Sequence, residues 1–445
     1  MATKITPISG FPELLPRERF AEQRVLDVVR RTFELHGYAG IETRAVEPVE
    51  RLVGKGGDAD KEIYAVSRLA GGEDARDASL GLHFDLTVPF ARYVLENAGK
   101  LDFPFRRYQI QKSWRGERPQ EGRFREFTQA DIDVVDIGSL PAHFEAEMPI
   151  VIAEIFEQLP VGDFRVRCNN RKIPQGFYLG IGLTDIVTTL RIVDKLDKVG
   201  AAGVRAMLVE AGATAQQAEQ CLALAEISTA DGGFVDQVRA LGVDHPLLQE
   251  GLQTLAEVMS AASAATRPGR VVADLSVARG LDYYTGTVYE TQLVGFESWG
   301  SVAGGGRYDA LASDGATTYP GVGISVGITR LVQLLIARRG LTTTRSTPSA
   351  VLVAVTDDAG RPRSAAVATA LRARGIPCEV APKADRFGKQ IRYADRRGIP
   401  YVWFPGAGDD DGDQVKDIRS GAQVPAQAPT WTCPDEDLRP ALRTD

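Results

Sequence analysis

Two stretches of this 445-residue chain combine side chains that could hold a small polar ligand. The first, Arg279–Glu290 (RGLDYYTGTVYE), carries an arginine, two adjacent tyrosines, an acid and three further hydroxyl groups. Buried strands usually prefer aliphatic residues and exclude Gly and Asp. We therefore interpret this stretch as a strand that forms one wall of a ligand pocket. An unusual but purely structural strand is the alternative.

The second stretch, Phe105–Val135, is predicted to form two strands joined by a loop around Glu117–Gly122, because Pro119 and Gly122 bracket that loop. Side chains alternate between the faces of a strand, and at about 3.4 Å per residue the second strand would span about 30 Å. Arginine suits phosphate oxygens and phenylalanine offers a stacking surface, so one face could hold a nucleotide beside a second ligand. A solvated face with surface ion pairs is the alternative. The face comprises Arg123, Arg125, Phe127, Gln129, Asp131 and Asp133.

The elements that would position these residues begin with an amphipathic helix. Apolar residues recur at helical spacing over Arg17–Leu35, and Gly37 follows as its stop. From Ile41 to Asp136, runs such as YAV, FDLTV, RRYQIQKSW and FREFTQADIDVV are typical of strands and hairpins. The second ligand-binding stretch is therefore expected on a sheet.

The middle of the chain is predicted to be largely helical. Met148–Ser263 is rich in Ala, Leu and Glu, and one helix, carrying RIVDKLDKVG, is expected to end at Gly200. Strand character returns over Val271–Val288, followed by a Gly-rich turn at Ala303–Arg307 and an apolar helix from about residue 327.

The C-terminal part is predicted to form a small parallel-sheet domain. The segment Arg338–Pro348 is polar and ends in proline, which is typical of a linker. After it, strand and helix patterns alternate in a βαβ rhythm. The segments are Ala350–Val355, Ala365–Arg374, Pro377–Val380, Phe387–Arg397 and Tyr401–Phe404.

Length and composition favour a soluble globular protein of two or three domains. No apolar run is long enough to span a bilayer, and the N-terminal residues lack the layout of a signal peptide. We therefore expect a cytoplasmic protein. The four cysteines are far apart, which argues against zinc and against a disulfide framework. The net charge of -7 does not exclude a nucleic-acid partner, because local patches decide that.

Several blocks of sequence resemble one known family. WRGERPQEGRFREFTQADID is similar to motif 2 of the class II aminoacyl-tRNA synthetases in its histidine-specific form. HFDLTVPFARY precedes it, and NNRKIPQG, DKLDK, RGLDYYTGTVYE, GGGRYD and GVGISVGITRLV follow in the family's order. ETRAVEPVE resembles motif 1. The chain thus resembles the histidyl-tRNA synthetases over nearly its full length, and it has no P-loop or dinucleotide-binding glycine motif.

This resemblance implies an α+β catalytic domain with the class II antiparallel sheet and flanking helices, followed by a C-terminal α/β anticodon-binding domain. The catalytic domain is expected over residues 1–340, with a mostly helical insertion at about 180–265. A linker is expected at 341–348 and the anticodon-binding domain at 349–445. Motif 1 implies a homodimer.

The resemblance also assigns roles to individual residues. Arg279 and Arg115 would be catalytic, beside the reacting carboxylate and the phosphates. Arg118 and Gln120 would contact the tRNA. ATP binding is expected of Arg115, Glu117, Arg123, Phe127 and Arg330. Histidine binding is expected of Asp85, Leu86, Thr87, Arg115, Gln129, Asp133, Arg279, Tyr283 and Tyr284.

The implied activity is ATP-dependent activation of L-histidine and its transfer to tRNA(His). ATP with Mg²⁺ is the expected substrate, without zinc, an organic cofactor or a dedicated protein metal site. A catalytically silent paralogue, of the kind that regulates ATP phosphoribosyltransferase, is the alternative; a tRNA-sensing module and a class II synthetase for another amino acid fit less well. His83 and Thr329 depart from the residues common in the family, arginine and glutamate.

Overall fold

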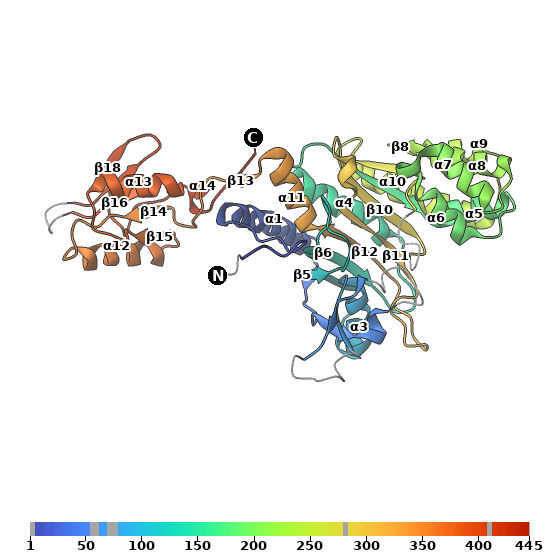
Figure 1. Ribbon diagram of the computed structural model, residues 1–445, viewed down its shortest axis with the longest axis horizontal. Coiled ribbons are helices and arrows are strands. Elements are labelled where there is room, and N and C mark those ends of the chain that lie inside the picture. The colour runs from blue at the N-terminus through green and yellow to red at the C-terminus, as the bar shows by residue number, and fades with distance from the viewer. Residues whose placement is uncertain (1–4, 54–61, 69–78, 279–283, 407–411, 445) are drawn as a thin grey trace. The chain divides into compact units, whose positions relative to one another are not determined.

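The computed structural model describes residues 5–53, 62–68, 79–278, 284–406 and 412–444. The chain divides into two compact units. One comprises the residues up to Pro12 together with Leu26–Leu334, and the other comprises Glu13–Val25 together with Leu335–Asp445. The predicted domain boundaries at 340 and 349 remain predictions. Figure 1 shows the helices and strands of both units.

A nine-stranded, mostly antiparallel sheet organises the first unit. Its order is β1-β5-β6-β12-β11-β10-β7-β9-β8, with β1/β5 and β7/β9 parallel. This is the antiparallel class II sheet expected from the sequence. The strands are β1 (Ala39–Gly40), β5 (Phe105–Trp114), β6 (Glu126–Val135), β7 (Phe164–Asn170), β8 (Ser228–Thr229), β9 (Val271–Asp274), β10 (Thr287–Leu293), β11 (Ala303–Tyr308) and β12 (Gly321–Gly327).

The β5–β6 hairpin matches the predicted pair of strands, with one correction. β6 begins at Glu126, so Arg123 and Arg125 precede the strand and lie in the connecting loop. The alternating face is therefore shorter than predicted and runs from Phe127 to Asp133. It faces a cavity described below, whereas Ile132 and Val134 on the opposite face are fully buried.

The run FDLTV does not form the predicted strand. A three-stranded sheet of order β2-β4-β3 precedes it, and a helix begins within it at Thr87. The Asp85 side chain accepts a hydrogen bond from Val88 N (3.1 Å), which satisfies a backbone donor of the first helical turn. The elements here are β2 (Val46–Pro48), α2 (Val49–Leu52), β3 (Ala65–Val66), β4 (Leu80–Leu82), α3 (Thr87–Asn97) and a 3₁₀ turn at Ala98–Lys100.

Helices cover the sheet and form the insertion. The first helix spans Pro16–Leu35, close to the prediction, and Gly37 has a positive φ of 77°. The buried side chains of α4 pack on β7 and β12 and form part of the core of this unit. The sequence missed β7, which interrupts the predicted helical stretch. The helices are α1 (Pro16–Leu35), α4 (His143–Glu157), α5 (Lys172–Gly180), α6 (Ile186–Val193), α7 (Leu196–Glu210), α8 (Ala215–Ala225), α9 (Phe234–Ala240), α10 (Pro246–Ala265) and α11 (Ile328–Arg339).

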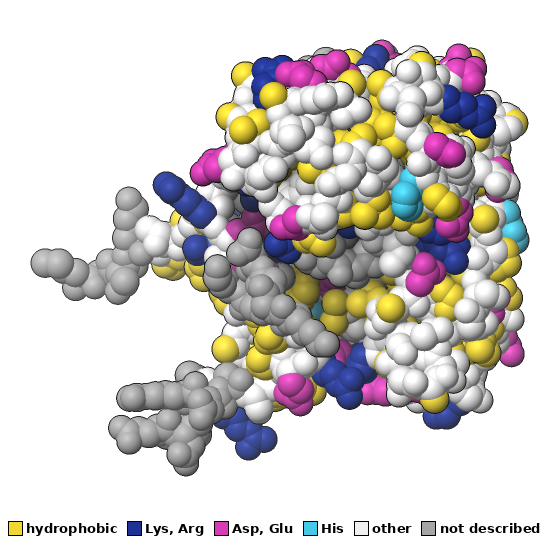
Figure 2. Space-filling model, turned by 90° about the vertical axis from the view of Figure 1, so that its right-hand side faces the viewer, with side chains coloured by type: hydrophobic (Ala, Val, Ile, Leu, Met, Phe, Trp, Pro, Cys, Tyr) yellow, Lys and Arg dark blue, Asp and Glu magenta, His cyan; other side chains and the backbone are white. Residues whose placement is uncertain are grey.

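The predicted helix through RIVDKLDKVG is two helices. α6 ends at Val193 and α7 begins at Leu196. Gly200 does leave the helical conformation (φ 70°, ψ 171°), so α7 is kinked there. Figure 2 shows the side of the molecule that carries these helices: among its coloured side chains, basic and acidic groups are interspersed with hydrophobic ones.

The second unit contains a five-stranded sheet of order β15-β14-β16-β17-β18. Its first three strands are parallel, as the βαβ rhythm predicted. The elements are β14 (Val351–Val353), α12 (Arg361–Ala373), β15 (Cys378–Val380), α13 (Phe387–Arg397), β16 (Tyr401–Phe404), β17 (Gln414–Asp417), β18 (Gln423–Pro425), α14 (Asp435–Leu438), and the β13–β19 pair (Thr342–Thr343 and Leu442–Arg443).

The polar segment before this sheet is packed rather than extended. Arg345 is buried and donates hydrogen bonds to the carbonyl oxygens of Thr347, Pro348 and Asp437. The guanidinium thus holds the segment against α14. In α13, Gln390 is buried and bonds the backbone of Val355.

Candidate active site

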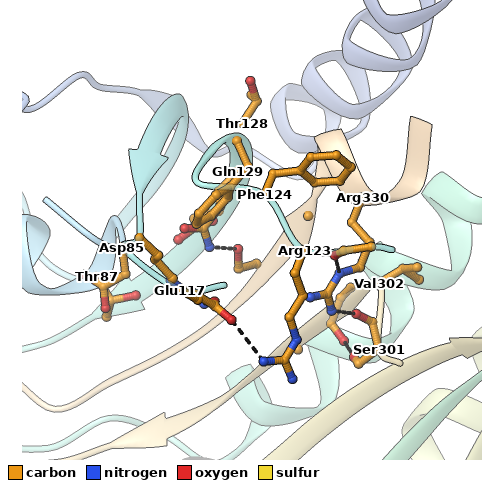
Figure 3. Close-up of a pocket in the computed structure, with 18 of the residues that line it drawn as sticks. Asp85, Thr87, Glu117, Arg123, Phe124, Thr128, Gln129, Ser301, Val302 and Arg330 are labelled. Atoms are coloured by element: carbon orange, nitrogen blue, oxygen red, sulfur yellow. Dashed lines mark hydrogen bonds and ion pairs between the residues drawn. The ribbon is translucent and has the colours of Figure 1, made fainter. Parts of the chain in front are cut away.

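A cavity of about 290 Å³ opens on the first unit, where β5, β6, β11 and β12 meet the start of α3 (Figure 3). Residues far apart in the sequence line it because the sheet order brings their strands together. The lining includes nine of the residues selected from the sequence: Asp85, Thr87, Arg115, Glu117, Arg123, Phe127, Gln129, Tyr284 and Arg330.

One side of the cavity is rich in guanidinium groups. Arg123 Nη1 donates to Glu117 Oε2 at 2.9 Å. Arg330 is held at the start of α11 by bonds of 2.6 Å from Nε to Gly122 O and from Nη1 to Ser301 O. The two bonds fix the plane of the Arg330 guanidinium, and the single bond links the Arg123 guanidinium to Glu117. Fixed guanidinium groups suit the oxygens of a polyphosphate.

Phe127 provides an aromatic face beside these cations. The guanidinium carbon of Arg115 lies 5.1 Å from the centre of the Phe127 ring, which is the geometry of a cation–π contact. Arg115 Nε donates to Phe84 O at 3.0 Å, so the side chain is anchored to the segment before α3. A planar heterocycle could stack on such a ring.

The opposite side is acidic and deeply buried. Asp85, Asp131 and Asp133 are each at most 9% exposed, and one fully buried arginine, Arg107, accompanies them. Arg107 Nη2 lies 2.5 Å from Asp133 Oδ2, because the two residues face each other across the β5–β6 pair. Burial raises the pKa of Asp131 to about 7 and that of Asp133 to about 6, although Arg107 opposes both shifts.

Burial also raises the pKa of Asp85, against the opposing effects of its bond from Val88 N and of the charge on Arg115. Three buried carboxylates outnumber the one buried guanidinium. This side of the cavity therefore favours a ligand that brings positive charge and N–H donors.

A smaller space of about 20 Å³ adjoins the main cavity and shares five lining residues with it. Asp133 lines this inner space, as does Tyr308, whose hydroxyl donates to Asp133 Oδ1 at 2.8 Å. Gly323 faces Asp133 from β12, and a Cβ built there would lie 2.0 Å from Asp133 Oδ1. Only glycine leaves room for the carboxylate.

In the described part of the expected strand Arg279–Glu290, only the residues from Thr287 onward form a strand. β9 ends at Asp274 and β10 begins at Thr287, so Tyr284 precedes the strand. Tyr284 lines both spaces, and its ring packs where a Cβ on Gly306 would approach it to 2.9 Å. Arg279 and Tyr283 lie outside the described residues.

Three further predicted residues lie away from the cavity. Leu86 is fully buried, immediately before α3. Arg118 and Gln120 are exposed in the loop between β5 and β6. The backbones of Gln120 and Arg123 bond each other, which closes a tight turn at the loop tip. The roles assigned to these residues remain predictions.

The structure adds residues that the sequence reasoning did not assign to the site. Asp131 was placed on the correct strand face but received no role. Ser325 accepts a bond from Gln129 Nε2 at 2.7 Å, and Arg107 and Tyr308 bind Asp133. Arg107 could have been found from the hairpin register, whereas Ser325 and Tyr308 come from strands whose neighbours the sequence did not predict.

The two departures from the family pattern have defined contacts. His83 is buried, with Nε2 2.7 Å from Lys112 O and its ring 5.5 Å from that of Trp114. Thr329 Oγ1 accepts a bond from Thr128 N at 2.8 Å. Both side chains therefore support the strands around the cavity.

Neither a metal cluster nor a membrane span is found within the described ranges. No group of three or more His, Cys, Asp or Glu side chains there could hold a metal ion. No helix there is long and apolar enough to cross a membrane. All four cysteines are free and buried.

Comparison with known proteins identifies the family. Residues 10–331 match the family model for histidyl-tRNA synthetase, and residues 349–425 match the model for an anticodon binding domain. Histidine–tRNA ligases of Micrococcus luteus and Cutibacterium acnes are 58% and 56% identical to this chain. The alignments cover 98% of both chains for the first and 99% of both for the second.

Solved structures agree with the sequence comparison. The crystal structure of histidyl-tRNA synthetase from Nostoc sp. PCC 7120 has a TM-score of 0.86 at 35% identity, covering 96% of this chain and 97% of that one. A structure from Bacillus halodurans, described as an ATP phosphoribosyltransferase regulatory subunit/histidyl-tRNA synthetase, has a TM-score of 0.72 at 18% identity and shares the fold. The chain belongs to the histidyl-tRNA synthetase family.

Proposed function

We propose that this chain is a histidine–tRNA ligase, which activates L-histidine with ATP and transfers it to the 3′ end of tRNA(His). The observation that carries the proposal is the two-sided cavity, with guanidinium groups on one side and buried carboxylates on the other. ATP fits the first side and the cationic amino acid fits the second. The full-length similarity to histidine–tRNA ligases supports this assignment.

In the first step, a carboxylate oxygen of histidine attacks the α-phosphorus of ATP. An O–P bond forms, the bond to the bridging oxygen breaks, and pyrophosphate leaves with that electron pair. Negative charge accumulates on the phosphate oxygens, and the arginines that line the cavity would stabilise it: Arg115, Arg123 and Arg330. Holding two bound reactants together accounts for much of the remaining rate gain.

Adenine would stack on Phe127, opposite the guanidinium of Arg115, with Glu117 at its edge. Arg279 is proposed to lie beside the reacting carboxylate on the strength of the RGLDYYTGTVYE resemblance alone. In the second step, a ribose hydroxyl at the tRNA 3′ end attacks the acyl carbon of the adenylate, and AMP leaves.

Histidine would be selected by groups that need N–H donors. Asp85 and Thr87 would hold the α-ammonium group, Gln129 and Asp133 would face the rest of the amino acid, and Tyr284 would cover it. A pocket built around hydrogen-bonding groups rejects an apolar side chain strongly, because its polar groups would be left unpaired.

Magnesium would enter with ATP as part of the substrate. Glu117 is the carboxylate on the phosphate side of the cavity, and no set of three possible ligands surrounds it within the described residues. This fits an ion that is held largely by phosphate oxygens and water, as Mg²⁺ usually is. Charge neutralisation at the phosphates is what the ion would supply.

The partners follow from the same proposal. Arg118 and Gln120, exposed in the β5–β6 loop, would contact the acceptor end of tRNA(His). The second unit would bind the anticodon, supported by the anticodon binding domain match over residues 349–425. The motif 1 segment Glu42–Glu50 would form a homodimer interface, and the enzyme would act in the cytoplasm.

The silent regulatory paralogue is not favoured. The chain carries both the arginine-rich side of the cavity and the anticodon binding domain, which such a paralogue would not need.

Charging of tRNA(His) with labelled histidine tests the proposal. Purified protein should form acid-precipitable histidyl-tRNA only when ATP and Mg²⁺ are both present. Histidine binding without any charging of intact tRNA(His) would instead support the regulatory alternative.

A further inference from the structure

Asp131 is a buried carboxylate of the cavity with one oxygen that no donor satisfies. It is 2% exposed and lines both the main cavity and the smaller space behind it. Its Oδ1 atom is buried and has no hydrogen-bond partner among the described residues. A buried carboxylate oxygen without a donor is costly, so its presence calls for a reason.

The Ser325 hydroxyl and the charge of Arg107 both favour the ionised form of Asp131, but its Oδ1 atom has no donor. Asp133 has Arg107 on one oxygen and the Tyr308 hydroxyl on the other. Asp85 accepts a bond from Val88 N. In the part of the chain that the structure describes, no Lys, Arg or His nitrogen forms an ion pair with Asp131.

A second unsatisfied acceptor lies on the same strand face. Gln129, two residues before Asp131 on β6, uses its amide nitrogen to bond Ser325, and its Oε1 atom is buried without a partner. Residues two apart on a strand share a face, so both acceptors are presented to the same cavity. Two unsatisfied acceptors of this kind match a ligand that supplies N–H donors.

We infer that Asp131 binds the substrate directly, accepting a hydrogen bond from a cationic N–H group of histidine. This inference deepens the proposed function and rests on it. The donor is either the α-ammonium group or the imidazole ring, since Asp131 borders both spaces. Asp133, held by Arg107 and Tyr308, would still face the amino acid from the inner end of the pocket. Burial, which raises the pKa of Asp131 to about 7, agrees with a carboxylate that lacks a partner until the ligand binds.

The test compares Asp131→Asn with the wild-type protein. The substitution keeps the shape and removes the charge, so the Kd for L-histidine by calorimetry should rise about tenfold or more, as expected for loss of a charge-assisted hydrogen bond. The KM for ATP should stay within about twofold. The ligand-free melting temperature should be unchanged or higher, because a buried uncompensated charge is removed. Asp136→Asn, at the partly exposed residue that follows the same strand, is the matched control and should alter none of these values.

Imidazole-lactate, which lacks the α-ammonium group, distinguishes the two donors. If the substitution weakens binding of histidine alone, the donor is the ammonium group; if it weakens binding of both, the donor is the imidazole. An unchanged histidine Kd would overturn the inference. A ligand-free variant that unfolds, or melts at a lower temperature than the wild type, would also overturn it, because Asp131 would then have a structural role. Asp131→Ala would repeat the comparison. Wild-type protein that binds no histidine would instead sink the proposed function.

Discussion

At the scale of single residues, Arg107 is the group on which the acidic side of the pocket depends. It is fully buried, contacts Asp133, and stacks 4.3 Å above the Phe90 ring. It opposes the raised pKa values of Asp131 and Asp133, and it does so without lining the cavity itself. Arg107 therefore positions Asp133 and adds positive charge near the cavity from a place outside the cavity lining.

Arg107→Met should lower the free energy of unfolding by about 3–5 kcal/mol at neutral pH, because one partner of a buried ion pair is removed. Adding Asp133→Asn should recover part of that loss, since no buried charge is then left unpaired. Urea unfolding measures both. Arg239→Met breaks an exposed pair with Asp236 and should cost less than about 1 kcal/mol. Equal losses for the buried and exposed pairs would refute this account.

The buried carboxylates also predict a pH dependence. Folding raises the pKa of Asp131 to about 7 and of Asp133 to about 6, from about 3.9 in an unfolded chain. Between the unfolded and folded pKa values, the folded state therefore binds more protons than the unfolded state. The stability that these two carboxyls contribute is complete below about pH 4 and is lost as pH rises toward 7. Three groups face the pair from neighbouring elements: Arg107 lowers the pKa of both carboxyls, Ser325 lowers that of Asp131, and Asp85 raises both.

Ligand-free Asp131→Asn should therefore show a smaller loss of stability between pH 5 and pH 8 than the wild-type protein. Urea unfolding at the two pH values provides the measurement. A wild-type protein whose advantage over the variant grows with pH would have the opposite sign and would contradict the proposed protonation of Asp131.

At the scale of elements, the inner end of the pocket exists because β12 carries glycine opposite Asp133. Gly323→Ala should displace the carboxylate or the strand, since the added Cβ would meet Asp133 and the Ile132 carbonyl oxygen at 2.6 Å or less. We expect a loss of about 1–3 kcal/mol in stability, and at least a tenfold fall in histidine activation. Gly388→Ala in α13, where a Cβ meets nothing within 4 Å, should change stability by no more than about 1 kcal/mol. Full activity in Gly323→Ala would disprove this role.

Several patterns within one element were predicted well from the sequence, although the Gly-rich stretch Ala303–Arg307, predicted as a turn, forms β11. Contacts between distant elements were not predicted. The β5–β6 hairpin and the βαβ alternation of the second unit depend on local periodicity and turn residues, and both are present. FDLTV was wrongly predicted as a strand because its apolar residues fit a strand or a helix equally well. Asp85 accepts a hydrogen bond from the first turn of α3, which begins at Thr87. β7 was missed because its run is short and lies between helices.

The candidate site shows the same division. The face from Phe127 to Asp133 followed from alternation along one strand. Ser325 and Tyr308 were missed because β12 and β11 join that face only through the order of the sheet. Tyr284 lines the cavity from the non-strand backbone that precedes β10. The sequence there is typical of a strand, so it did not predict this conformation.

At the scale of the whole molecule, we propose that the first unit activates histidine and the second unit binds the anticodon. Exposed basic side chains of α13 line a hollow of about 640 Å³ in the second unit: Lys389, Arg392 and Arg396. Cationic groups of this kind fit a phosphate backbone.

The double variant Arg392→Ala, Arg396→Ala should raise the KM for tRNA(His) about tenfold and weaken its salt dependence, because phosphate contacts are lost. Steady-state charging at several salt concentrations measures this. ATP–pyrophosphate exchange, which does not require tRNA, should be unchanged. A fall in exchange would instead mean that the substitutions damage the catalytic unit.

The most direct test of the central claim, that the cavity selects and activates histidine, is ATP–pyrophosphate exchange with each of the twenty amino acids in turn. We predict rapid exchange with L-histidine alone. Asp133→Asn should reduce it at least about tenfold, because the Arg107–Asp133–Tyr308 arrangement is broken. Exchange that is absent with histidine, or equally rapid with another amino acid, would contradict the account.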